Sequence, residues 1–457
     1  MNKSIAALYN SPLNQRICKV LDNFFCLTDR GTSVRQEFIA ALTTFATMSY
    51  VLAVHPMIMA DAGMDRAQAL TVTALVAGTF SILMGVMANI PIAQAPGMGA
   101  NALFAYTIIL VMGVPWEAAL GLVFWSGVFF LILTLTGIRK ILLDAFPVSI
   151  KCALTAGIGL FIMFIGLRDS GILADSPVML IQIGDITGPP VLLSLAGIPL
   201  VMALMAKKVP AAIFLTIILI TTAGLFIPLN ETSNVSDLPQ AFVSKPVPID
   251  TLWLALDPWY LFRNFSSTLP VLLSLIFIDL FSSLAAMNAM CKRAGLVDRE
   301  GNMLNPNKAL SADALATIGA AMAGTSTTNC YGESAAGIES GGRTGLVAIF
   351  VGLLFFLALF FAPLFLIVPP QATAPALVFI GLLMFSEVRN INFDEAITSG
   401  SATLTLILMA VTSISDGLAI GLIFYIIGMT LTGKARQLHP IAFALGISFI
   451  GYYALTY

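Results

Sequence analysis

The sequence predicts an all-α integral membrane protein with about 14 transmembrane segments, and three observations support this fold class. Apolar residues make up 58% of the 457 residues. Asp, Glu, Lys and Arg together make up only 10%, whereas a soluble domain carries about 25%. The apolar residues occur in runs of about 20, the length that crosses a bilayer as a helix. These features exclude a water-soluble enzyme and a nucleic-acid-binding protein.

The predicted segments form two sets of about seven. The first set lies near residues 38–58, 68–87, 90–112, 117–137, 150–167, 189–206 and 210–228. The second lies near 266–290, 310–323, 325–342, 344–368, 373–387, 395–412 and 414–432. Lys and Arg cluster in the N-terminal stretch and between alternate segments, so we expect the N-terminus on the cytoplasmic side. The last run, 440–457, is either an extra crossing or a helix along the interface.

Charge and cysteine content indicate neither a polyanionic partner nor a metal site. The formal net charge is -2, from 22 basic and 24 acidic residues. The cysteines lack metal-binding spacing and are expected to be free thiols: Cys18, Cys26, Cys152, Cys291 and Cys330. We find no nucleophile with a base at useful spacing and no phosphate-binding loop for ATP. We therefore expect no cofactor, no metal and no enzymatic activity.

Two segments are unlike ordinary membrane helices, because they are rich in glycine, proline and hydroxyl groups. They are Ile90–Tyr106, IPIAQAPGMGANALFAY, and Gly324–Gly345, GTSTTNCYGESAAGIESGGRTG. Pro91 and Pro96 lack a backbone donor, so we expect Ala95–Gly99 to be extended. Helix-forming residues resume after Asn101 and after Glu333, so each segment is predicted to be an extended half followed by a half-helix.

The two breaks occupy corresponding places, the third segment of each set. Extended backbone at membrane depth is tolerated only inside protein or along a cavity, and such paired breaks are typical of transporters built from inverted repeats. Glycines also allow close helix packing without a ligand, an equal alternative for Gly337, Gly341 and Gly342. The five polar residues Thr325–Asn329 favour a binding or pathway role, because burying unpaired polar groups costs free energy.

Two acids inside the predicted segments occupy positions that favour a functional role. Asp279 is flanked by apolar residues in LSLIFIDLFSSL, and Glu333 begins the second half-helix in YGES. A carboxylate at mid-membrane costs about 2.5–3.5 kcal/mol on insertion scales, so each acid should face a cavity or take up a proton. We interpret both as proton-coupling candidates, the alternative being structural acids bonded to neighbouring Ser or Thr.

Other charges have plainer interpretations. Glu37 is expected to cap the first helix. Asp416 is expected to cap the last predicted segment, the alternative being that it lines the interface between the last two segments. Glu339 and Arg343 are four residues apart, so they form either an intrahelical pair or a functional one.

Five stretches of the chain are distinctive in combination: RGTSVRQEFIAALTTFATMSYVLAVHP, NIPIAQAPGMGANALFAY, IKCALTAGIGLFIMFIGL, GTSTTNCYGESAAGIESGGRTGL and ATAPALVFIGLLM. They closely resemble the azaguanine-resistance branch of the nucleobase:cation symporter-2 family. The resemblance implies two inverted repeats of about seven segments, with short strands in segments 3 and 10. It also implies purine bases as substrates, taken up with protons.

The resemblance further implies an N-terminal stretch, a core domain and a gate domain. The expected blocks are the cytoplasmic N-terminus 1–36, core 37–145, gate 146–262, core 263–370, and gate 371–457 with the C-terminal stretch.

By the same resemblance, Asp279 and Glu333 bind the base and Gly332 presents its backbone amide. A carboxylate accepting from a ring N–H and an amide donating to a ring nitrogen or oxygen can fix a purine in its plane. Met98 and Gly99 are expected on the strand of the third segment, and Asn101 at the start of its half-helix. Residues of the first segment border the pocket: Thr43, Thr44 and Met48.

The chain departs from this branch in the eighth segment. Relatives read close to DLFDTTGT, whereas here the sequence is DLFSSLAAM, so an acid and a glycine–threonine pair are missing. Ser282 and Ser283 stand nearby as neutral substitutes. The usual proline of the thirteenth segment is also absent.

The resulting hypothesis is proton-coupled uptake of adenine, hypoxanthine or guanine across the inner membrane by an elevator-like mechanism. The expected partners are a purine base, a proton with sodium as the alternative coupling ion, membrane lipid and a second copy in a homodimer. Alternatives are another small substrate on the same fold, such as uracil, xanthine or a sulfate-like anion, or a passive channel.

Overall fold

The computed structural model describes residues 12–456, except 138–146, 177–179, 231–232, 240 and 299–302. The predicted boundary between the first core and gate blocks, at residues 145–146, lies outside the described residues. The first half of the chain forms these elements: α2 (Pro12–Phe25), α3 (Val34–Met48), α4 (Val51–Asp61), α5 (Arg66–Ala88), β1 (Gln94–Pro96), α6 (Met98–Ala102), the π-helix η1 (Leu103–Val111), α7 (Trp116–Leu135), α9 (Val148–Asp169), β2 (Leu173–Ser176), β3 (Leu180–Ile183), α10 (Pro189–Ala206), α11 (Ala212–Gly224) and α12 (Tyr260–Arg263).

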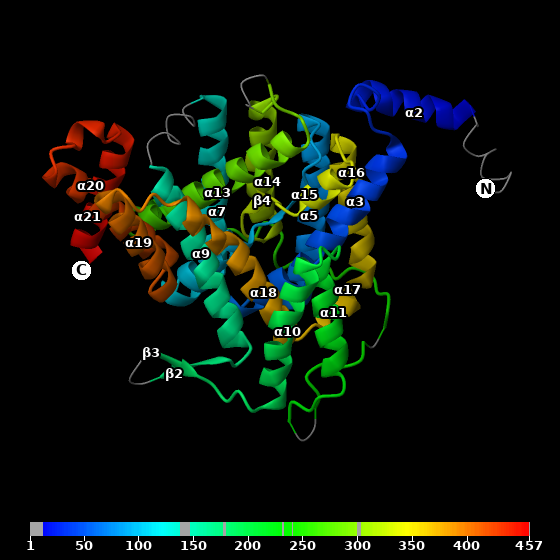
Figure 1. Cartoon of the computed structure of the whole chain (residues 1–457), viewed down its shortest axis with the longest axis horizontal. Coiled ribbons are helices and arrows are strands. Elements are labelled where there is room, and N and C mark those ends of the chain that lie inside the picture. The colour runs from blue at the N-terminus through cyan, green and yellow to red at the C-terminus, as the bar shows by residue number, and fades with distance from the viewer. Residues whose placement is uncertain are drawn as a thin grey trace.

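The second half follows the same alternation of long and interrupted elements. It comprises α13 (Phe265–Arg293), α14 (Pro306–Ala323), β4 (Thr328–Cys330), α15 (Ser334–Glu339), α16 (Gly345–Ala358), the 3-10 turn η2 (Leu359–Phe361), α17 (Ala362–Leu366), α18 (Pro370–Phe385), η3 (Ser386–Asn390), α19 (Ala396–Val411), α20 (Ile414–Leu431), η4 (Ala435–Gln437) and α21 (Pro440–Thr456). Figure 1 shows most of the long helices side by side in one bundle.

The membrane fold class is confirmed. Among the described residues, nine helices are long and apolar enough to cross a bilayer, and four shorter apolar helices accompany them. Each predicted segment coincides with one or more of the elements above. The number of segments that actually cross, about 14, stays a prediction.

Short strands occur in both interrupted segments, as predicted. β1 pairs antiparallel with β4, with Gln94 opposite Cys330, Ala95 opposite Asn329 and Pro96 opposite Thr328. The prediction that Met98 and Gly99 lie on the strand was wrong. Pro96 ends the strand and Gly97 caps the next helix, because the Gly97 carbonyl accepts the Asn101 backbone N–H at 2.8 Å. The half-helix therefore begins at Met98, three residues before the predicted Asn101.

The helices pack in two groups joined by a smaller number of contacts. In one group α5 packs on α16 and α14, and α7 packs on α14. In the other, α9 packs on α18 and α19, and α10 packs on α18. Glycines allow the closest approach: a Cβ on Gly159 of α9 would lie 2.5 Å from the carbonyl oxygen of Gly381 in α18. Small residues at such crossings let helix backbones meet in a membrane.

The C-terminal run forms helix α21, which packs against α20 and α13. The Tyr453 hydroxyl donates to Asp416 Oδ1 at 2.6 Å. Asp416 also accepts from the Ser413 hydroxyl, and the Asp416 backbone N–H donates to Ser413 Oγ at 3.0 Å. Ser413 is therefore the N-cap of α20 and Asp416 lies in its first turn, so the predicted cap at Asp416 was wrong. Residues 440–456 form a helix that packs on the bundle, and whether it crosses the bilayer stays a prediction.

Candidate functional site

The site is built around the β1–β4 pair, whose hydrogen bonds extend beyond the two strands. The Gly97 backbone N–H donates to the Thr327 carbonyl at 2.9 Å, and the Tyr331 N–H donates to Ala93 at 3.0 Å. The Tyr331 hydroxyl donates to the Pro96 carbonyl at 2.7 Å. These bonds satisfy extended backbone that would otherwise be unpaired inside the protein, so the two half-helices begin from one rigid junction.

Asp279 lies on α13 against this junction and is 1% exposed. The Thr317 hydroxyl of α14 donates to its Oδ2 at 3.2 Å. With its amide nitrogen towards Asp279, Asn329 of β4 donates to Oδ1 at 2.7 Å and accepts from the Ser282 hydroxyl at 2.8 Å, which satisfies both ends of the amide. A hydroxyl donor from α14 and an amide donor from β4 thus orient this carboxylate.

Glu333 occupies the cap position at the start of α15. The Tyr50 hydroxyl, at the break between α3 and α4, donates to Glu333 Oε1 at 2.6 Å. The Thr47 hydroxyl donates to the Glu333 carbonyl at 3.4 Å. Glu333 is half-buried, while Gly332 is exposed and no atom lies within 4 Å of the position of a Cβ there. This turn therefore borders open space beside the Glu333 carboxylate. The N–H groups that follow, of Ser334, Ala335 and Ala336, donate to carbonyls of the same turn.

The two acids flank the same strand. Asn329 of β4 contacts Asp279, and the chain then turns through Tyr331 into Glu333. The rings of Tyr331 and Tyr50 lie with centroids 6.4 Å apart, beside Glu333. The structure thus brings together the predicted pair of acids and the predicted Gly332.

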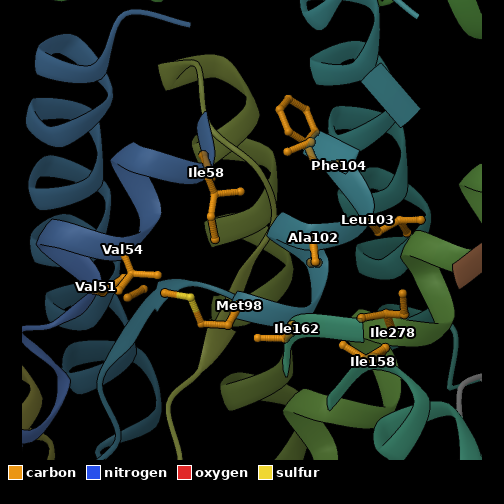
Figure 2. Close-up of a cluster of buried hydrophobic side chains, with 14 of the residues drawn as sticks. Val51, Val54, Ile58, Met98, Ala102, Leu103, Phe104, Ile158, Ile162 and Ile278 are labelled. Atoms are coloured by element: carbon orange, nitrogen blue, oxygen red, sulfur yellow. The ribbon is translucent and has the colours of Figure 1, made fainter. Parts of the chain in front are cut away.

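The predicted residues of the third segment lie where α6 meets α9. Figure 2 shows Met98 and Ala102 near Ile158 and Ile162 of α9 and near Ile278, the residue before Asp279. Gly99 packs on α9, since a Cβ there would lie 2.9 Å from Ile158 Cγ2. Asn101 accepts a hydrogen bond from the Ser326 hydroxyl. These residues form an apolar wall beside the polar junction.

Of the remaining predicted residues, Ser283, Thr44 and Met48 are buried, and Thr43 is half-buried. Ser283 is fully buried, and among the described residues its hydroxyl has no hydrogen-bond partner. Thr44 is also fully buried and packs against Gly337, which supports the packing interpretation of that glycine. Thr43 donates to the Ile39 carbonyl, and Met48 is fully buried. From this helix, it is Thr47 that reaches Glu333.

Two further charge interpretations needed correction. Glu37 does not cap its own helix but accepts from the backbone N–H groups of Arg343 and Thr344, at 2.8 and 3.0 Å, before α16. Glu339 pairs with Arg293 at 2.8 Å, whereas the Arg343 guanidinium donates to backbone carbonyls. Spacing along one helix cannot predict the partners of Glu37 and Glu339, because these partners belong to other segments.

Sequence reasoning missed four polar residues of the junction. Tyr50 and Thr317 hold the two acids, and Gln94 donates to the buried Asp313 at 2.8 Å behind β1. Two signals in the sequence could have found them. Tyr50 lies beside a helix break, and Asp313 is an acid on the alanine-rich helix α14. No group of three or more His, Cys, Asp or Glu side chains suited to a metal ion occurs within the described ranges.

Comparisons with known proteins agree with this fold. A family model described as a permease family matches residues 35–417. The putative permease MJ0326 of Methanocaldococcus jannaschii is 39% identical over 95% of this chain and 98% of its own length. The adenine permease AdeQ of Escherichia coli is 38% identical over 92% of this chain and 93% of its own length. The guanine/hypoxanthine permease PbuG of Bacillus subtilis is 39% identical, over 95% and 99%.

Solved structures support the fold alone. The transmembrane domain of the cyanobacterium bicarbonate transporter BicA has a TM-score of 0.63 at 16% identity and covers 85% of this chain and 97% of that one. SLC26A9 has a TM-score of 0.60 at 10% identity and covers 92% and 70%.

Interrupted segments that meet in a helical bundle, with polar groups at the junction, define a multi-pass membrane transporter. The chain belongs to this permease family, the nucleobase:cation symporter-2 family that the sequence resembles. Membership makes it a transporter and not an enzyme, as predicted.

Proposed function

We propose that the chain takes up purine nucleobases together with protons across the inner membrane, with its N-terminus in the cytoplasm. The observation that carries this proposal is the strand junction flanked by Asp279 and Glu333, which opens at Gly332. The substrate class is supported by relatives named as adenine or guanine/hypoxanthine permeases, which are 35–39% identical.

The polar groups of the junction suit the edge of a purine. Glu333 accepts from a ring N–H, while the backbone amide of Gly332 donates to a ring nitrogen or an exocyclic oxygen. Met98 and Ile158 supply an apolar surface for the face of the ring. A planar heterocycle with both donors and acceptors satisfies this arrangement better than a small inorganic anion, which offers no N–H to a carboxylate.

A proton balances the charge of the occupied site. The hydrogen bonds described above reach Asp279 and Glu333 from hydroxyl and amide groups, which orient a carboxylate without cancelling its charge. A charge inside a membrane protein is costly, so protonation of one acid when the base binds lowers the cost of moving the loaded site. Asp279 and Glu333 are therefore the proposed proton-coupling residues.

Movement follows from the two packing groups. We assign 37–145 and 263–370 to a core domain that carries the base, and 146–262 and 371–457 to a gate domain that forms a homodimer. The contact of Gly99 with Ile158 supports this division, because small and apolar residues at the boundary let one group slide past the other. Alternating access then takes the junction from one side of the membrane to the other.

Uptake of radiolabelled purine in a bacterial strain lacking its own purine uptake tests the proposal. We expect accumulation against a gradient that a protonophore abolishes and that unlabelled adenine, hypoxanthine or guanine competes with, while uracil and sulfate do not. Glu333→Gln should abolish uptake at unchanged membrane expression, and Glu339→Gln on the same half-helix should not. Saturable uptake that never exceeds equilibrium, or normal uptake by Glu333→Gln, would count against the proposal.

A further inference from the structure

Helix α2 (Pro12–Phe25) projects from the bundle and is not one of its crossings. Figure 1 shows it, in dark blue, extending sideways from the end of the bundle beside α3 and α16, with its axis roughly perpendicular to many of the bundle helices. A short helix in this position, directly before the first membrane helix, lies where an interfacial helix meets the lipid surface.

The apolar side of α2 is divided between protein and open surface. Leu21 and Phe25 pack on Leu27 and Leu346, and Phe25 is only 4% exposed. One helical step away, Val20 is 67% exposed and Phe24 is 55% exposed. Val20 and Phe24 are four residues apart, so they form one exposed apolar edge of the helix.

The charges of α2 favour a negatively charged surface. Lys19 is exposed beside Val20. The single acid of the helix, Asp22, is already engaged, because the Thr28 backbone N–H and hydroxyl both donate to it at 2.7 Å. These bonds lower the pKa of Asp22 and turn its charge towards the loop. Among the described side chains, the charge beside the apolar edge is therefore the Lys19 ammonium, which suits lipid phosphates.

Exposed apolar side chains on α3 indicate that lipid lies on the same side of the bundle as the exposed edge of α2. On α3, the apolar side chains of Phe38, Ile39 and Leu42 are each about two-fifths exposed, at 42%, 41% and 42%. In a membrane bundle such side chains face lipid. α2 leaves the bundle just beyond this lipid-facing surface, so lipid headgroups lie beside its exposed edge.

From these observations we propose that α2 binds the anionic lipid surface on the side of the N-terminus. Val20 and Phe24 insert among the acyl chains, and Lys19 lies at the level of the phosphates. The side of the membrane rests on the orientation proposed above, whereas lipid binding does not depend on the substrate.

The helix is also fixed to the group of segments that holds the site. Leu27 packs on Leu346 at the start of α16. Arg30 donates from Nη1 to the carbonyls of Asn89 and Arg343, at 2.6 and 3.0 Å. Arg343 follows α15, whose first turn carries Glu333. Lipid binding by α2 therefore holds the cytoplasmic end of this group at the membrane surface.

Photo-crosslinking in the full chain tests the proposal directly. p-Benzoylphenylalanine replaces Phe24 or, as a matched control on the polar face, Asn23, which is exposed on the same helix. The protein is irradiated in vesicles of phosphatidylcholine with or without phosphatidylglycerol, and adducts are identified by mass spectrometry. We expect several-fold more lipid adduct at position 24 than at 23, enriched in phosphatidylglycerol, with the enrichment lost in Lys19→Gln.

Equal lipid adduct at positions 23 and 24, no lipid adduct at 24, or an adduct only with a second copy of the chain would overturn the proposal. Adducts at 24 that show no preference for phosphatidylglycerol would refute the part assigned to Lys19. Because the readout is a covalent adduct, it is independent of purine uptake, so failure of the proposed function leaves this test intact.

Discussion

The two interrupted segments have the same backbone plan but different surroundings. In the first, every residue from Gln94 to Ala102 is buried, and the segment Ile90–Tyr106 contains no charged residue. In the second, the turn after β4 opens at Gly332 and places Glu333 at the start of α15. The first interrupted segment therefore has a structural role, and the second supplies the exposed turn and the carboxylate of the proposed site. Inverted repeats preserve the fold while one copy specialises.

After Glu333→Gln, the largest expected effect comes from Asp279, the acid that the second segment orients. In Asp279→Asn, the Asn329 amide loses its charged acceptor, and a hydrogen bond to a charged group contributes about 1.5–3 kcal/mol. We expect uptake to fall roughly 100-fold and its pH dependence to flatten. The control is Asp394→Asn, an exposed acid before α19. A mutant with the pH profile of the unaltered protein would remove Asp279 from proton coupling.

Removal of the hydroxyl that holds Glu333 should have a smaller effect. Tyr50→Phe deletes the 2.6 Å bond to Glu333 Oε1 and leaves the ring in place. We expect a roughly 10-fold rise in the purine concentration for half-maximal uptake, since one charge-assisted hydrogen bond is lost. Tyr260→Phe on α12 is the matched change outside the junction. If both variants transport alike, Tyr50 does not position Glu333.

The role of the first interrupted segment can be tested at Gly97, which lies against Asn329 of the second interrupted segment. A Cβ at Gly97 would lie 2.7 Å from Asn329 Cγ, so Gly97→Ala pushes the Asn329 amide away from Asp279. The Gly97 backbone, at φ -75 and ψ 124, accepts alanine without strain. We expect uptake to fall about threefold to 10-fold, to the level of Asn329→Ala.

The control for this substitution is Gly400→Ala, because no atom lies within 4 Å of the position of its Cβ. Adding Gly97→Ala to Asn329→Ala should cause little further loss, since both act on the same side chain. Additive losses would show that Gly97 acts through the backbone and not through Asn329.

The smallest effect is expected for the exposed ion pair at the end of the second segment. Arg293 and Glu339 are 57% and 67% exposed, and exposed pairs contribute about 0–1 kcal/mol. Arg293→Gln should leave uptake unchanged and lower the melting temperature by no more than a few degrees in detergent. A large loss of uptake would indicate that this pair belongs to the transport machinery.

The sequence predicts the interrupted segments and their acids because the signal is local. Proline and glycine restrict the backbone within a few residues, and an isolated acid in an apolar run stands out. The partners of those acids are not predictable in this way. Tyr50 and Glu333 are 283 residues apart, and nothing near either residue encodes their hydrogen bond.

The wrong predictions for Met98, Gly99 and Glu37 arise for the same reason, because contacts between distant segments decide their structure. Met98 and Gly99 read as extended because glycine weakens a helix, yet the packing of Gly99 on α9 and the cap at Gly97 hold them in α6. Glu37 reads as a local cap, but the fold brings the backbone of Thr344 to it. In both cases a tertiary contact overrides the local preference.

A structure of the full chain in lipid nanodiscs with a bound purine is the most direct measurement. We expect the base at the β1–β4 junction, within hydrogen-bonding distance of Glu333 and of the backbone amide of Gly332. Purine found elsewhere in the bundle, with both acids remote from it, would contradict the assignment of the two interrupted segments as the transport site.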